Sequence, residues 1–318
     1  MGGRDCNIGK EYDITVASTI VLLILVAETF GGMWIQSFIV AVNCLERVKH
    51  RSLSLSDNIL TVVAFSRFCF LLKTTSQTFC SAFYPEIYYS DSVFQAFKAL
   101  TWFLNSSNQW FAACLCVFYC VKVANYSHPL FICLKFKISR LVPWLLLASV
   151  LLSFFSSIPF LSTIYKIHCP DLNSSLIQTY KLNNVTVETS VSYVLFICGI
   201  GFSMAFTIFI TSAFLLLFSL GRHTQQMQSN SSHFRSPSVE AHIQAMKAIM
   251  SFCLINIVNF IALLILLTNT FEEMSAGGLA FTLITDICPT THSIILVLSN
   301  PKLKKTLINV LHNAKCKG

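Results

Sequence analysis

Seven long apolar runs alternate with short polar segments along the 318-residue chain. They cover positions 14–44, 58–83, 99–121, 141–165, 189–221, 248–271 and 274–300. Each exceeds the roughly 20 residues that a helix needs to cross a bilayer. The runs also lack the polar stripe that a surface helix of a soluble protein carries. The pattern therefore predicts an all-α membrane protein, a bundle of seven transmembrane helices.

Polar residues at the ends of some runs extend the expected helices slightly. We expect helices at about 14–44, 58–83, 91–121, 141–165, 189–221, 242–271 and 274–300, and a single seven-transmembrane domain over 1–318 with no separate soluble domain. The composition agrees, because 54% of the residues are hydrophobic and 11% charged, whereas soluble domains carry about 25% charged residues. The net charge of +8 does not point to nucleic acid, since Lys and Arg lie between the apolar runs.

Lys and Arg are distributed unevenly between the two sides of the predicted bundle. Most lie in the gaps after the first, third and fifth runs or in the C-terminal tail. The other side holds fewer: Arg4, Lys10, Lys73, Lys98, Lys166 and Lys181. Because positively charged loops stay on the cytoplasmic side, we expect the N-terminus outside the cell and the C-terminus in the cytoplasm.

The segment 118–135 carries the most specific motif of the chain. It reads Phe-Tyr-Cys-Val-Lys-Val-Ala-Asn-Tyr-Ser-His-Pro-Leu-Phe-Ile-Cys-Leu-Lys. It resembles the cytoplasmic end of the third transmembrane helix in the type 2 (bitter) taste receptors, where the pattern is close to Phe-Tyr-x-x-Lys-Ile-Ala-x-Phe-Ser-x-Pro-x-Phe-x-x-Leu-Lys. Val123 and Tyr126 are mild departures from that pattern.

Other helices resemble the same family. The second run contains Ala-Phe-Ser-Arg at 64–67, and the seventh contains Pro-Thr-Thr-His-Ser at 289–293. The resemblance implies a non-enzymatic, G-protein-coupled receptor, multi-pass in the plasma membrane and in contact with its lipid. Such a receptor binds small bitter-tasting agonists in the outer part of the bundle and activates a heterotrimeric, gustducin-like G protein. It implies no cofactor, metal ion or nucleic-acid partner.

A polar strip in the outer half of the third run is the candidate ligand site. Spacings of three and four place Thr101, Asn105 and Asn108 on one helix face, with Trp102 alongside. The resemblance makes Asn105 a pocket residue and adds Thr282 of the seventh run. The alternative is that these polar groups join helices to one another.

Arg67, Asp286 and His292 are polar residues inside apolar runs that we expect to make contacts between helices. An intramembrane charge is costly and marks a specific contact. Arg67 and Asp286 fall at similar depths, so they form either an ion pair or separate contacts, with Arg67 bonded to Ser, Asn and backbone carbonyls. The second interpretation is favoured. We expect His292 to serve packing and hydrogen bonding.

The resemblance also assigns the cytoplasmic and outer loops. G-protein coupling is expected at Lys122, His128, Pro129, Lys135 and His242. Glycosylation is expected at Asn173 and Asn184, because the other Asn-x-Ser/Thr sequences fall in the membrane or the cytoplasm. A disulfide between Cys80 and Cys169 is left open.

Two other classes of protein share some of these features. The first is the type 1 vomeronasal (pheromone) receptor, an allied seven-helix family, but Lys-x-Ala-x-(Phe/Tyr)-Ser-x-Pro favours a taste receptor. The second is a membrane transporter or channel, which predicts internal repeats or paired broken helices, and neither is evident in this sequence.

Overall fold

The computed structural model describes residues 16–50, 54–88, 90–124, 129–162, 190–230, 237–267 and 276–315. All secondary structure in these ranges is helical. The helices are α1 (Val16–His50), α2 (Leu55–Phe83), α3 (Pro85–Tyr88), α4 (Asp91–Val123), α5 (Pro129–Ser162), α6 (Ser190–Asn230), α7 (Pro237–Leu267), α8 (Ala276–Ser299) and α9 (Pro301–Lys315). The expected all-α class is confirmed.

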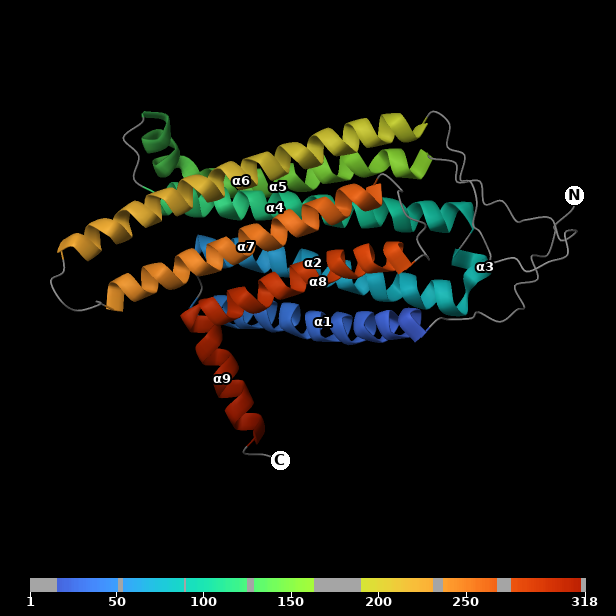
Figure 1. Cartoon of the computed structure of the whole chain (residues 1–318), viewed down its shortest axis with the longest axis horizontal. Helices are drawn as coiled ribbons and strands as arrows, with labels where there is room; N and C mark the ends of the chain where they lie inside the picture. Colours follow the sequence, from blue (N-terminus) through green and yellow to red (C-terminus); the bar gives the residue numbers. More distant parts are fainter. Residues whose placement is uncertain are drawn as a thin grey trace, which may run out of the picture.

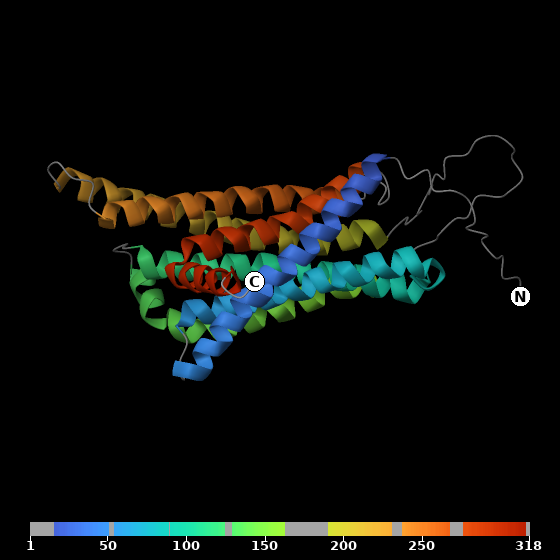
Figure 2. The same ribbon diagram turned by 90° about the horizontal axis from the view of Figure 1, so that it is seen from below.

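The seven long helices run side by side, and α9 leaves the bundle at a steep angle (Figure 1). Seen from below, α1 crosses the others obliquely (Figure 2). The central helix is α4, which packs against α2, α5 and α6. On its other side α2 contacts α1, while α8 packs against α1 and α7.

Within the described ranges, six helices are long and apolar enough to cross a membrane: α1, α2, α5, α6, α7 and α8. Their outward faces carry large apolar side chains such as Trp144, Phe155 and Phe214, each more than 60% exposed. An apolar surface of this extent suits lipid rather than water. The coarse expectation of a multi-pass membrane bundle is therefore confirmed.

The seventh long helix, α4, falls short in hydropathy because of a buried polar stretch. Five consecutive residues, Asn105 to Gln109, are polar, and four of them are buried. In a bundle such groups face other helices, because lipid offers them no hydrogen-bond partner. The low hydropathy of α4 thus follows from its central position.

Several helices extend beyond the expected bounds. The fourth long helix, α5, begins at Pro129 rather than near 141, and α6 continues to Asn230 rather than 221. Proline is favoured in the first turn of a helix, where its missing N–H has no partner to lose. The basic residues after the third apolar run therefore lie on a helix, where hydropathy alone showed only a polar gap.

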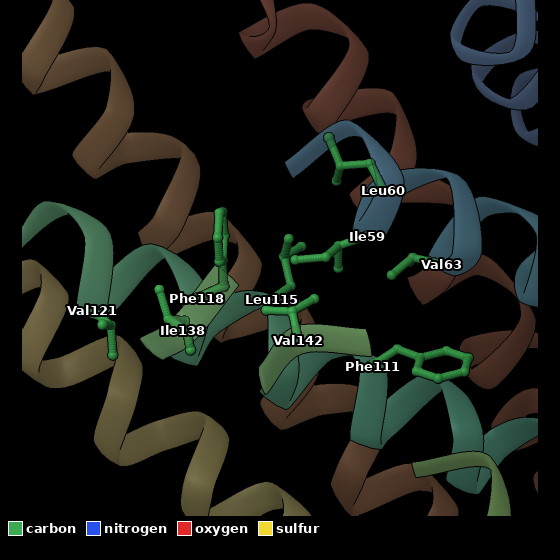
Figure 3. Packing of buried hydrophobic residues seen from close by; sticks show 9 residues of the cluster. All are labelled: Ile59, Leu60, Val63, Phe111, Leu115, Phe118, Val121, Ile138 and Val142. Atoms are coloured by element: carbon green, nitrogen blue, oxygen red, sulfur yellow. The ribbon is translucent and has the colours of Figure 1, made fainter. Parts of the chain in front are cut away.

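An apolar cluster joins α2, α4 and α5 in the half of the bundle where α4 ends. It contains Ile59, Leu60, Val63, Phe111, Leu115, Phe118, Val121, Ile138 and Val142 (Figure 3). The α4 members recur at three- and four-residue spacing, which places them on one helix face. This cluster packs α4 against α2 on the C-terminal side of the polar stretch of α4.

The junction of α8 and α9 is tied to α1 and α2. The side chain of Asn300 accepts hydrogen bonds from the backbone N–H groups of Lys302 (3.0 Å) and Leu303 (3.4 Å), which caps α9. The ammonium group of Lys302 forms ion pairs with Glu46 of α1 and with Asp57 of α2. These contacts set the direction in which α9 leaves the bundle.

Candidate functional site

The guanidinium group of Arg67, on α2, is held by three groups of α8. Its Nη1 donates hydrogen bonds to Ser293 Oγ (2.8 Å) and to the Pro289 carbonyl (3.3 Å), and it lies 2.7 Å from His292 Nδ1. Arg67 is only 5% exposed. The fold thus places the buried charge of Arg67 against a short segment of α8 that is rich in hydrogen-bond acceptors.

Gln36 of α1 extends this network to a third helix. Its amide nitrogen donates to Ser293 Oγ (2.9 Å), and its amide oxygen lies 3.2 Å from the same hydroxyl. Gln36 is completely buried. One hydroxyl group, that of Ser293, therefore links α1, α2 and α8.

The contacts of Arg67 bear on its two expected arrangements, an ion pair with Asp286 or separate contacts. Among the described residues, its hydrogen bonds go to a serine, a histidine and a backbone carbonyl, and none goes to the Asp286 carboxylate. This arrangement favours separate contacts over an ion pair between Arg67 and Asp286.

Asp286 belongs to a second charged cluster, which sequence reasoning missed. Its buried carboxylate interacts electrostatically with Lys73 of α2 and with Glu28 of α1. Lys73 is 7% exposed and donates to Gln77 Oε1 (3.1 Å). Lys73 was expected among the outer-side charges, and its position inside the run 58–83 was the available signal of its burial.

A small cavity lies between α2, α4, α7 and α8, beside the Arg67 network. Its volume is about 20 Å³, which suits a single water molecule rather than a drug-sized compound. Its polar wall is formed by side chains from all four helices: Arg67, Asn108, Gln109, Asn256, Asn259 and His292. Gln109, Asn256 and Asn259 were not among the residues expected from the sequence.

The five residues expected to bind a ligand are not all brought together. Asn108 lines the cavity. The amide nitrogen of Asn105 donates to the Thr101 carbonyl (3.0 Å), and the Thr101 hydroxyl donates to the Phe97 carbonyl (2.6 Å), all within α4. These hydrogen bonds within α4 give partners to polar groups of the strip that the sequence predicts.

Trp102 faces another direction. Its indole N–H donates to Ser156 Oγ of α5 (3.1 Å), and its ring packs on Phe160 and Phe202, with ring centroids 5.5 and 5.6 Å away. Thr282 is half-buried on α8, four residues before Asp286 and therefore on the same helix face.

The residues expected at the coupling end lie on three helices. Lys122 is exposed in the last turn of α4, with its ammonium group 5.4 Å from the centre of the Phe118 ring. Pro129 and the exposed Lys135 lie in the first two turns of α5, and His242 lies on α7. His128, Asn173, Asn184 and Cys169 lie outside the described residues.

No group of three or more His, Cys, Asp or Glu side chains within the described ranges could hold a metal ion. Some of the buried polar groups, among them Gln36, Arg67 and Ser293, form hydrogen bonds between helices. Such networks can position helices and recognise small molecules.

Comparison with known proteins identifies the family. The model of the family described as "Taste receptor protein (TAS2R)" matches residues 14–315. "Taste receptor type 2 member 40" of Gallus gallus is 36% identical over 296 residues, which cover 93% of this chain and 95% of the relative. "Taste receptor type 2 member 9" of Homo sapiens is 34% identical over 304 residues, covering 93% and 95%.

A third relative agrees with these two. "Taste receptor type 2 member 39" of Macaca mulatta is 38% identical over 300 residues, 92% of this chain and 87% of the relative. These matches confirm the resemblance found in the sequence and do not favour a vomeronasal receptor, a transporter or a channel. The chain belongs to the TAS2R family of taste receptors, which are G-protein-coupled receptors and not enzymes.

Proposed function

We propose that this chain is a plasma-membrane receptor that binds small bitter compounds at one end of its helix bundle and activates a heterotrimeric G protein at the other. The observation that carries the proposal is the family match, which extends over residues 14–315 and thus over every long helix. The apolar outer faces of the bundle supply the lipid contacts.

The distribution of charge supports one orientation. Lys122, Lys135 and the α9 lysines lie at the end of the bundle where α4 terminates and α8 joins α9. Because basic segments remain cytoplasmic, this end faces the G protein, which is gustducin-like by analogy with the family. The N-terminus and the segment 163–189, with Asn173 and Asn184, then lie outside the cell as part of one seven-transmembrane domain.

The proposed agonist site lies toward the outer end of α4 and α8. Thr101, Asn105 and Asn108 share a face of α4, and Thr282 lies on α8. In the described structure the cavity near Asn108 is too small for a bitter compound. Binding therefore requires side chains of this region, some of them bonded only within their own helix, to move apart. Trp102 supports the site by fixing α4 against α5 and α6.

The test is a calcium-mobilisation screen of bitter compounds in cells that express the chain with a promiscuous G-protein α-subunit. We expect concentration-dependent responses to some compounds and none in cells without the receptor. A receptor that is present at the cell surface, measured by an epitope tag, yet silent to a broad panel of bitter compounds would contradict the proposal.

A further inference from the structure

The cavity between α2, α4, α7 and α8 is lined by buried polar atoms that lack partners. Among the described residues, no hydrogen-bond partner is present for Arg67 Nε, for either amide atom of Asn108 and Gln109, or for Asn259 Oδ1. Gln109 is 2% exposed and Arg67 is 5% exposed. A buried polar group without a partner is costly, and several such groups around one cavity indicate a common ligand.

The register of the helices explains why amide side chains of α4 and α7 line the same cavity. One turn along the bundle, Ala112 and Cys116 of α4 pack with Phe252 of α7 in an apolar cluster. The Phe252 ring also stacks on His292 of α8, with centroids 3.8 Å apart. One to two turns from this contact along each helix, amide side chains take the place of apolar ones. They are Gln109 on α4 and Asn259 on α7.

The chemistry of the lining selects the ligand. The unpartnered groups include donors, at Arg67 Nε and the two amide nitrogens, and acceptors, at the three amide oxygens. A ligand that both donates and accepts is required, and the volume of about 20 Å³ admits one water molecule. A metal cation is disfavoured by the guanidinium charge, and chloride would leave the amide oxygens without donors.

We propose that this cavity is a structural water site, in which bound water joins Arg67 and the amides of α4 to Asn259 of α7. The water extends the Arg67–His292–Ser293 network, which already links α1, α2 and α8, to α4 and α7. Buried waters of this kind typically make about three hydrogen bonds.

The first experiment measures the thermal unfolding of the purified full-length receptor and of Gln109→Met, Asn259→Leu and the double variant. If water fills the site, each replacement strands the remaining partners, so we expect the unfolding midpoint to fall by roughly 2–4 °C or more. The double variant should fall by less than the sum of the two, because the water is already lost in either single variant. Thr211→Val is the control, because it removes an exposed hydroxyl that is bonded within α6. It should change the unfolding midpoint little.

A dry cavity predicts the opposite sign. Replacing unpaired buried amides by apolar side chains of similar size would then remove a desolvation cost, and the midpoints would rise. Replacement of chloride by gluconate at constant ionic strength should leave the midpoint of the parent protein unchanged. A rise in the first series, or a clear fall without chloride, overturns the water site.

The second experiment detects the water directly and is independent of how the variants pack. Cys288 lines the cavity, whereas Cys198 is completely buried elsewhere, against α5. Brief X-ray radiolysis in ¹⁸O-water generates hydroxyl radicals from bound water and labels adjacent sulfur atoms. We expect label on Cys288 but not on Cys198, and its loss in the double variant. The absence of label on Cys288 in the parent protein overturns the proposal whatever the unfolding data show.

Discussion

Arg67 Nη1 lies 2.7 Å from His292 Nδ1, which joins the second and the seventh long helices in the interior of the bundle. A guanidinium group can only donate, so Nδ1 must accept the hydrogen bond and cannot carry a proton. His292 is therefore the neutral tautomer with its hydrogen on Nε2. Its ring stacks on Phe252, with centroids 3.8 Å apart.

This network predicts that Arg67→Ala lowers the stability of the receptor. The change removes the donor to His292 Nδ1 and one of the hydrogen bonds of Ser293, whose hydroxyl keeps its bond to Gln36. A stranded buried group such as His292 Nδ1 costs about 1–3 kcal/mol. We expect a lower unfolding midpoint and reduced surface expression. Asp286→Asn is the comparison, because the losses from the two sites should add. If Asp286→Asn reproduces the Arg67→Ala defect and the double variant adds nothing, the two residues act as a pair.

The charged cluster predicts coupling between Lys73 and Asp286. Lys73→Met leaves the buried Asp286 beside the half-buried Glu28 without the interacting ammonium group, so surface expression should fall. Adding Asp286→Asn should restore part of that loss, with an interaction energy of about 0.5–3 kcal/mol in a double-mutant cycle. Strictly additive losses in unfolding midpoints would show that the two groups do not interact.

Two adjacent glycines provide a matched test of helix packing in α1. A Cβ atom at Gly32 would lie 2.6 Å from Thr290 Oγ1 and 2.8 Å from Leu71 Cδ1, whereas one at Gly31 would have no atom within 4 Å. Gly32→Ala should therefore lower the unfolding midpoint, as α1 is pushed from α2 and α8. Gly31→Ala should be neutral or slightly stabilising, because alanine favours helix by about 1 kcal/mol. Equal effects of the two changes would argue against close packing at Gly32.

The proposed topology predicts where sugar is attached. Glycosidase treatment should increase the electrophoretic mobility of the parent receptor but not that of a variant with both Asn173→Gln and Asn184→Gln. A shift that persists in that variant would place another Asn-x-Ser/Thr sequence outside the cell, against the orientation inferred from Lys and Arg.

The two ends of α4 should respond differently to substitution. Asn105→Ala, toward the proposed outer end, should shift the potency of different agonists by different factors, because each agonist uses the amide differently. Lys122→Glu and His128→Ala should instead lower the maximal response to every agonist. Nucleotide exchange on the G protein, normalised to surface expression, measures both. Agonist-selective effects at Lys122 together with a uniform loss at Asn105 would reverse the assignment of the ends.

Part of the polar interior could be predicted from the sequence. An arginine within an apolar run must be buried and bonded, and Arg67 could be identified on that ground alone. Its partners could not, because counting residues from the helix ends placed Arg67 level with Asp286, whereas in the structure it contacts His292, six residues or about 9 Å further along α8. Lys73 was counted among the charges of the outer side, because a count of Lys and Arg takes no account of which face of the helix a residue occupies.

The sequence by itself determined that the chain forms long apolar helices and belongs to the taste receptors, since segment length, apolar content and the motif at 118–135 depend only on residue order. The tertiary structure decided how the polar groups are arranged: Arg67 contacts His292, Asp286 lies within electrostatic reach of Lys73, and the amides of α4 line the same cavity as Asn259. The physical reason is that a helix surrounded by lipid and other helices has little polar contrast between its faces. Its rotation and depth are set by packing, as at Gly32, and hydropathy does not record them.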